Sequence, residues 1–358
     1  MTARTLALVE SPAQLLNVLE WALGDRAGAA ADRPVDIAVL LPQDDPTRRQ
    51  LAGMAELARS GGLRVSVHDI RGGPAALAGC GTRLAPRLAA AGRLVLGDPF
   101  SRLIQLLLPL SPARDIVLVD DGTATIGLAT ALNEGRPLVR WHRSAPDGSP
   151  AAGSASAARA TRRLTARPGH SVELFTSMAG ILPLPSGTLC TANRYTWARQ
   201  RFGRPTLLPL VDLAGSSLVE TGLLSRERYV EGVARLAARH GVSRYLAHRR
   251  EDPEKLRLLA AAAGVEVIRP DLPLELAVLD QPIGTTLLSF PSTILHTLPI
   301  VLRGHGVQIA ACEDIHEWLG PDTPAQVSAF LQQVSATAAD ALATTRPTNP
   351  GGQEAALT

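Results

Sequence analysis

The stretch IVLVDDGTATIG, residues 116–127, decides the fold prediction and raises the first question about function. Its first four residues are apolar β-formers, and such a run bounded by turn residues is typical of a buried strand. The run leads directly into Asp120, Asp121 and Gly122. Two adjacent carboxylates repel each other, which pushes one pKa upward. The stretch is therefore either an acidic turn or the site of a carboxylate that moves a proton.

Short apolar runs alternate with longer amphipathic runs around this stretch. Strand following helix in this way predicts an α/β domain with a mainly parallel sheet. The expected strands of this part are residues 5–10, 35–41, 63–70, 93–98 and 115–121, and the expected helices include 15–24 and 48–62.

A second α/β series follows in the later half of the chain. We expect two Rossmann-like domains, over residues 1–204 and 205–337, with mainly parallel sheets facing an interdomain cleft. The expected helices of the second domain are 226–241 and 254–264, and its expected strands are 243–248, 265–270, 285–290 and 307–312.

Two segments lack this periodicity. Residues 143–170 consist mostly of small and polar residues with a few arginines, which predicts a flexible loop. Residues 338–358 are expected to be a fraying C-terminal tail.

Composition limits the functional classes. Hydrophobic residues make up 46% of the 358 residues and charged ones 19%, which indicates a globular protein. The net charge of +3 is slight. It argues against a nucleic-acid-binding surface but permits binding of an anionic substrate or peripheral contact with a membrane.

The cysteines and the apolar runs bear on localisation. Cys80, Cys190 and Cys312 are too far apart for a metal motif or a disulfide framework, which suits a reducing cytoplasm. The N-terminal apolar run is too short for a signal peptide, and no later run is long enough to span a bilayer. We therefore expect a cytoplasmic protein, with contact at the inner face of the cell membrane left open.

The DDG segment permits two interpretations. One aspartate caps a helix that begins just after Gly122, while the glycine permits the tight turn. A single cap needs only one carboxylate, so the other faces solvent or the cleft. A carboxylate in the cleft is a candidate general base. The residues alone do not choose between the two.

The segment ESPAQLLN follows the first expected strand. Ser11 is a good helix N-cap, Pro12 fits the first helical position, and Gln14 completes a capping box. The first turn after a strand is also a common ligand position. Ser11 and Gln14 are therefore both helix-capping residues and candidate ligand contacts.

Two polar segments follow expected strands of the second domain. His248 comes at a strand end beside Arg249 and Arg250, where an anion would be favoured, although arginines are also common on solvated faces. The pair Ser292–Thr293 precedes a helical pattern, as a phosphate site or a helix cap requires. His296, one turn further on, is expected to be a packing residue.

Several familiar motifs are absent from the sequence. It contains no GxGxxG after the first strand and no GxxxxGK[ST], which argues against a standard dinucleotide or P-loop site. It also contains no HExxH, no clustered Cys/His site and no GxSxG. We therefore expect neither a bound metal nor a cofactor.

The motifs that are present occur in an order that resembles the bacterial sialyltransferases and polysialyltransferases. The similar groups are glycosyltransferase family 52 and the capsular α-2,8-polysialyltransferases. The matching residues are SPAQ (11–14), DDG (120–122), HRRE (248–251), PLE (273–275) and ST (292–293).

This resemblance implies a GT-B fold and an inverting, metal-independent glycosyltransferase. Such an enzyme moves a nonulosonic acid, for example sialic acid, from a CMP-sugar to a glycan hydroxyl. The implied general base is Asp120 or Asp121, with Asp120 the first choice. The resemblance assigns the CMP phosphate to His248, Ser292 and Thr293, and the cytidine ribose to Glu275. Ser11, Gln14 and Gly122 are the remaining candidate donor contacts.

Two positions depart from the pattern of these enzymes. Arg249 stands where a proline usually follows the histidine, and Ala13 stands where leucine is usual. Fold alone does not fix function. A GT-B glycosyltransferase or epimerase that uses a UDP- or GDP-sugar, and a non-catalytic protein that binds sugar nucleotides, are the alternatives.

Overall fold

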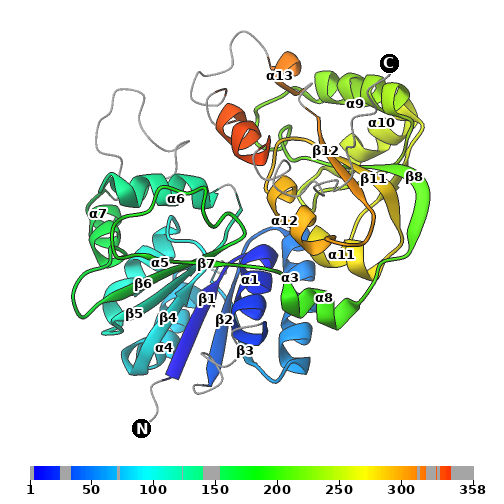
Figure 1. The fold of residues 1–358 in the computed structure, drawn as a ribbon. Helices are drawn as coiled ribbons and strands as arrows, with labels where there is room; N and C mark the ends of the chain where they lie inside the picture. Colours follow the sequence, from blue (N-terminus) through cyan, green and yellow to red (C-terminus); the bar gives the residue numbers. More distant parts are fainter. Residues whose placement is uncertain are drawn as a thin grey trace, which may run out of the picture.

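Two α/β domains make up the protein, as the computed structural model in Figure 1 shows. The first carries a seven-stranded sheet and the second a five-stranded sheet, and every strand pair is parallel. The structure describes residues 4–24, 34–70, 73–122, 124–139, 154–312, 315–319, 328 and 331–339.

The first sheet has the strand order β3-β2-β1-β4-β5-β6-β7. Its strands are buried on both faces: Leu6 and Leu8 of β1 pack into one hydrophobic cluster, while Ala7 and Val9 pack into another. This burial explains the continuous apolar runs in the sequence. The strands are β1 (Arg4–Val9), β2 (Val35–Leu41), β3 (Arg64–Asp69), β4 (Ala91–Leu96), β5 (Asp115–Val119), β6 (Ser171–Thr176) and β7 (Leu189–Ala192).

Helices cover both faces of the first sheet. The helices α1 (Pro12–Leu23), α3 (Asp45–Ser60) and α8 (Thr196–Phe202) supply residues to one cluster. The opposite cluster includes residues of α4 (Pro74–Ala90), α5 (Arg102–Leu107), η1 (Leu108–Leu110), α6 (Ala124–Asn133) and α7 (Ser154–Arg163).

The second sheet has the strand order β10-β9-β8-β11-β12. Its strands are β8 (Leu207–Ala214), β9 (Val242–Leu246), β10 (Glu266–Ile268), β11 (Ile283–Ser289) and β12 (Gln308–Ala311). Its helices are α9 (Arg226–His240), α10 (Pro253–Ala263), α11 (Leu274–Asp280), α12 (Ile294–Val301) and α13 (Ile315–Trp318).

The central strand β8 was not expected from the sequence, and Pro209 explains why. Proline cannot donate to a sheet ladder and argues against a central strand. In the structure, β8 pairs with β9 only from Val211 onward, and its pairing with β11 shifts register between Gly284 and Thr286. Pro209 therefore lies where the ladder is interrupted. Strands β6 and β7 were also missed.

The expected loop over residues 143–170 is wrong where α7 forms. Ala157, Ala160 and Leu164 are buried at spacings of three and four residues, so one side of α7 packs on the domain. The helix was not predicted because its short apolar stripe lies among many small and polar residues. The described part of the range begins at residue 154, and residues 143–153 lie outside it.

The C-terminal helical segment, residues 331–339, returns to the first domain (Figure 1, red). Its Val334 packs with Ile126 of α6 and with Met178. Ala338 is fully buried, so the structure differs from the expected tail beginning at residue 338. Residues 340–358 lie outside the described residues.

The two domains share packed contacts that fix how they face each other. Leu276 and Leu298 of the second domain belong to the same hydrophobic cluster as helix α1 of the first. The Gln50 side chain also donates across the boundary to the carbonyl oxygens of Pro270, at 2.9 Å, and Leu272, at 3.2 Å. The carboxyl ends of the strands in both sheets consequently open into one space.

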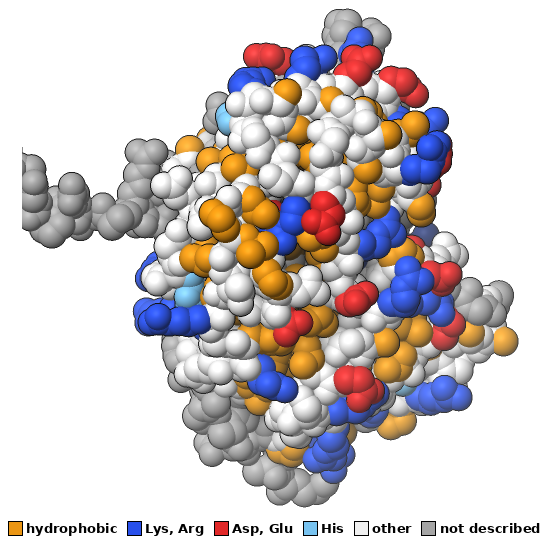
Figure 2. Space-filling model, turned by 90° about the vertical axis from the view of Figure 1, so that its right-hand side faces the viewer, with side chains coloured by type: hydrophobic (Ala, Val, Ile, Leu, Met, Phe, Trp, Pro, Cys, Tyr) orange, Lys and Arg blue, Asp and Glu red, His pale blue; other side chains and the backbone are white. Residues whose placement is uncertain are grey.

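The surface in Figure 2 carries interspersed basic and acidic side chains. A nucleic-acid-binding face instead carries a stripe of one sign. Among the described helices, none has the length and apolar character needed to cross a bilayer.

The buried ion pair of the second sheet generates a stability prediction. Asp212 is fully buried and accepts hydrogen bonds from Arg244, at 2.8 and 2.7 Å, and from Gly284 N–H at 2.6 Å. We expect Asp212→Asn to lower the free energy of unfolding by about 3–5 kcal/mol, because it leaves a buried guanidinium unpaired. Urea unfolding measures this change.

The matched control is Glu231→Gln, which breaks an exposed 3.9 Å pair with Arg235. It should change stability by less than about 0.5 kcal/mol. If both substitutions lowered the free energy of unfolding equally, the buried pair of Asp212 would not have the stabilising role described here.

Candidate functional site

A cleft of about 740 Å³ lies between the carboxyl ends of the two sheets. Ligands of open α/β sheets bind at such ends. All the candidate residues from the sequence line this one cleft although they are far apart in the chain: Ser11, Gln14, Asp120, Asp121, Gly122, His248, Glu275, Ser292 and Thr293.

Asp120 is a buried structural carboxylate, only 1% exposed. Its Oδ1 accepts from Thr125 Oγ1 at 2.6 Å, and its Oδ2 accepts from Thr176 Oγ1 at 2.8 Å. Ser177 donates to Oδ2 from both its backbone N–H, at 3.1 Å, and its hydroxyl, at 2.9 Å. These donors tie the end of β5 to α6 and to the end of β6.

Asp121, which also lines the cleft, is half-buried, in contrast to Asp120. Its Oδ1 accepts from Gln14 Nε2 at 2.8 Å, and Ser11 Oγ lies 3.5 Å from the same oxygen. The Glu10 N–H donates to Gln14 Oε1 at 2.7 Å, so the amide must turn its NH₂ group toward Asp121. Gln14, in the first turn of helix α1, therefore orients the carboxylate of Asp121.

The prediction that Ser11 caps α1 is confirmed, because its hydroxyl accepts from the Gln14 N–H at 3.2 Å. Gln14 does not complete the expected capping box, since its side chain reaches Glu10 N–H rather than Ser11 N–H. Gly97 gives this side chain its space: a Cβ at that position would lie 2.3 Å from Gln14 Oε1.

Gly122 brings the two halves of the site into contact. Its φ of +71° is one that residues with a side chain rarely adopt. A Cβ at this position would also lie 2.8 Å from Thr293 Oγ1, so the glycine permits the second domain to approach the DDG turn. The DDG turn and Thr293 are consequently neighbours.

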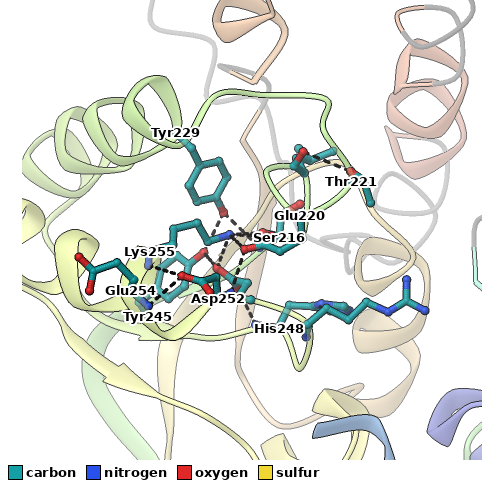
Figure 3. A network of polar contacts seen from close by, with 12 residues as sticks. Ser216, Glu220, Thr221, Tyr229, Tyr245, His248, Asp252, Glu254 and Lys255 are labelled. Atoms are coloured by element: carbon teal, nitrogen blue, oxygen red, sulfur yellow. Dashed lines mark hydrogen bonds and ion pairs between the residues drawn. The ribbon is translucent and has the colours of Figure 1, made fainter. Parts of the chain in front are cut away.

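The loop that carries His248 is held by a buried polar network (Figure 3). Glu251 accepts from the His248 N–H at 2.6 Å and from the Tyr245 hydroxyl at 2.7 Å, and it pairs with Lys255 at 2.9 Å. Lys255 has no exposed surface; it also pairs with Glu220 at 2.9 Å and donates to the Ser216 carbonyl oxygen at 3.1 Å. The network therefore fixes the backbone at His248.

The tautomer of His248 follows from its contacts. The backbone N–H of Arg250 donates to His248 Nδ1 at 3.3 Å, so Nδ1 carries no proton. In a neutral ring the proton is then on Nε2. Burial, followed by the charges of Arg249 and Arg250, lowers the pKa of His248 to about 3. The site thus presents a neutral imidazole with a donor at Nε2.

Glu275, Ser292 and Thr293 complete the second-domain side of the cleft. Glu275 lies in the first turn of α11 and accepts from Thr297 Oγ1 at 3.0 Å, and burial raises the pKa of its carboxyl. Thr293 is the N-cap residue of α12, yet its side chain makes no capping hydrogen bond. Ser292 Oγ lies 3.3 Å from Ser289 Oγ.

His296 is 2% exposed, which confirms the prediction that it is a packing residue.

Sequence reasoning missed the residues that support the DDG turn. Asn17 donates to the Asp120 carbonyl oxygen at 2.8 Å and accepts from Asn193 at 2.8 Å. Thr176 and Ser177 stand at the end of β6, which was not expected as a strand. The alternating apolar residues of SVELFT were the available signal.

Within the part of the chain that the structure describes, no group of three or more His, Cys, Asp or Glu side chains is arranged to hold a metal ion. What the lining of the cleft offers instead is hydroxyl, imidazole and guanidinium donors together with carboxylates. Such an arrangement suits an anionic ligand that lies next to a proton acceptor.

Two parallel-sheet α/β domains with the site between them define a GT-B fold. No protein-family model matches the chain, and no curated protein matches its sequence. A putative UDP-N-acetylglucosamine 2-epimerase from Listeria monocytogenes matches with a TM-score of 0.51 and 10% identity, over 96% of this chain and 90% of that chain.

Two sialyltransferase structures are also similar. An α/β-galactoside α-2,3-sialyltransferase from Photobacterium phosphoreum matches with a TM-score of 0.49 and 10% identity, over 93% of this chain and 94% of that chain. The GT-B domain of a sialyltransferase from Photobacterium damselae has a TM-score of 0.45 and 12% identity, over 93% and 96%. At these identities the likeness is one of fold.

The pKa of His248 predicts the behaviour of the protein on titration. The ring should remain neutral between pH 5 and 8, so its NMR resonances, assigned with His248→Gln, should not shift over that range. Below about pH 6.5, His248 binds a proton in the unfolded chain but not in the folded protein. This residue therefore makes stability fall as the pH drops toward 3. A titration midpoint between pH 5 and 8 would contradict the geometry described here.

Proposed function

We propose that the protein is an inverting glycosyltransferase that moves a nonulosonic acid, such as sialic acid, from a CMP-sugar to a glycan hydroxyl. One observation carries the proposal. A carboxylate at the end of β5 lines the same cleft as the phosphate-type donors of the second domain, and the two sides meet where Gly122 approaches Thr293. The resemblance of the motifs to sialyltransferases supplies the donor class.

The geometry favours Asp121 as the general base over Asp120, the first choice from the sequence. Both oxygens of Asp120 already accept hydrogen bonds, and its side chain is buried. Taking a substrate proton there would require these contacts to break. Asp121 is half-buried in the cleft, and Gln14 Nε2 donates to its Oδ1. A base must come within hydrogen-bond reach of the proton it removes.

The leaving group would be CMP, whose phosphate gains negative charge as the bond breaks. Its stabilisation needs preorganised donors. His248 Nε2–H and the hydroxyls of Ser292 and Thr293 are the candidates, and Glu275 would accept from the ribose hydroxyls.

In the proposed reaction the acceptor oxygen attacks the anomeric carbon from the face opposite the phosphate. The bond between the acceptor oxygen and the anomeric carbon forms, and Asp121 takes the hydroxyl proton. The bond between the anomeric carbon and the phosphate oxygen breaks, and its electrons leave with the phosphate of CMP. A single displacement of this kind inverts the anomeric centre. With side-chain donors at the phosphate, the reaction needs no divalent metal.

Substitution of the two aspartates tests the assignment. We expect Asp121→Asn to bind CMP with an unchanged Kd and to lose about 10²- to 10⁴-fold in turnover, because it lacks the base. Asp120→Asn should instead lower the free energy of unfolding by about 1–3 kcal/mol, since the amide leaves buried donors unpaired. Calorimetry gives the Kd, and CMP release from CMP-sialic acid with oligosaccharide acceptors gives the turnover.

Three results would count against this account. Full activity of Asp121→Asn would remove it as the base. Tighter binding of UDP or GDP than of CMP, or turnover of a UDP-sugar, would support the other GT-B enzymes. Binding of CMP without turnover of any CMP-sugar would favour a non-catalytic nucleotide-binding protein.

A further inference from the structure

The contact between His248 and Arg249 is long, and the tautomer of the ring decides whether it is a hydrogen bond. Arg249 Nη1 lies 3.5 Å from His248 Nε2. A guanidinium is always a donor. Since the Arg250 N–H occupies Nδ1, Nε2 carries the proton and is a donor as well. Two donors therefore face each other with no acceptor between them.

Within the part of the chain that the structure describes, Arg249 has no other partner that would explain its position. Its Nε is buried and makes no hydrogen bond, and among the described residues no carboxylate lies within ion-pair distance of its guanidinium. Asp121, Asp44 and Glu275 act on Arg249 only through their longer-range charge. A charged group held in a cleft without an acceptor is costly unless a ligand supplies one.

We propose that His248 and Arg249 form a two-donor clamp for one anionic oxygen of the donor substrate, which sits between Nε2 and Nη1. The clamp rests on the function proposed above and assigns a binding role to Arg249. The oxygen belongs to a phosphate or to a carboxylate, and a CMP-nonulosonate carries both groups.

Charge and shape favour an anion at this point. Arginine stays charged at all working pH values and presents several donors in a fixed plane. Its charge helps to keep the imidazole neutral by lowering the pKa of His248. An anion between the two groups offsets that repulsion and accepts from both. Charge-assisted hydrogen bonds of this kind are stronger than neutral ones.

Calorimetric titration of Arg249→Gln tests the clamp. The probes are CMP, cytidine, N-acetylneuraminate and inorganic phosphate. We expect the substitution to weaken CMP binding about 10- to 100-fold, as loss of a hydrogen bond to a charged group does, and to leave cytidine binding unchanged. If the carboxylate is the occupant, N-acetylneuraminate weakens by that factor and CMP does not.

The matched control is Arg257→Gln, which removes the same charge from an exposed pair with Glu254 on α10. It should leave all affinities unchanged, so a loss confined to Arg249→Gln reflects a contact rather than net charge. Arg249→Lys keeps the charge without the planar fork and should give an intermediate loss. A melting temperature equal to wild type for each variant excludes misfolding.

The binding experiments can overturn the clamp and the proposed function independently of each other. Wild-type affinity of Arg249→Gln for both CMP and N-acetylneuraminate would overturn the clamp and leave the function standing. Preference for UDP over CMP, with UDP binding lost in Arg249→Gln, would keep the clamp and overturn the donor class. A wild-type protein that binds none of CMP, UDP, N-acetylneuraminate and inorganic phosphate would overturn the clamp.

Discussion

The hydrogen bonds that saturate the carboxylate of Asp120 are the constraint on which the site depends. Donors from α6 and from the end of β6 occupy both its oxygens and hold the turn after β5 in place. That conformation carries Asp121 to the cleft and gives Gly122 the left-handed backbone that lets Thr293 approach. A single buried carboxylate thereby positions both its neighbour and part of the opposite domain.

The second domain meets this turn with a loop that is fixed in a comparable way. Glu251 and Lys255 are both buried, and each is satisfied by the other and by polar neighbours. Buried charges of this kind hold a backbone in place because breaking one partner is costly. His248 is therefore presented with its Nε2 donor beside Arg249. Preorganised donors need little rearrangement when charge develops on a leaving group.

Much of the fold was accessible from the sequence, because parallel strands buried on both faces leave continuous apolar runs. The ordered motifs also located the cleft residues on both sides. The division between Asp120 and Asp121 was not accessible, since it depends on Thr176 and Ser177, which stand more than fifty residues later in the chain. Strand β8 was not predicted, because Pro209 argues against a central strand. The tautomer of His248 follows from a contact of the Arg250 backbone N–H with the ring, which no residue pattern reveals.

The most direct test of the central claim is a crystal structure of the protein with CMP. The account predicts the phosphate within hydrogen-bond distance of His248 Nε2 and beside Ser292 and Thr293. It also predicts the ribose at Glu275, with the carboxylate of Asp121 facing the space left for the sugar. A phosphate bound away from His248, or a nucleotide bound outside the interdomain cleft, would contradict the account.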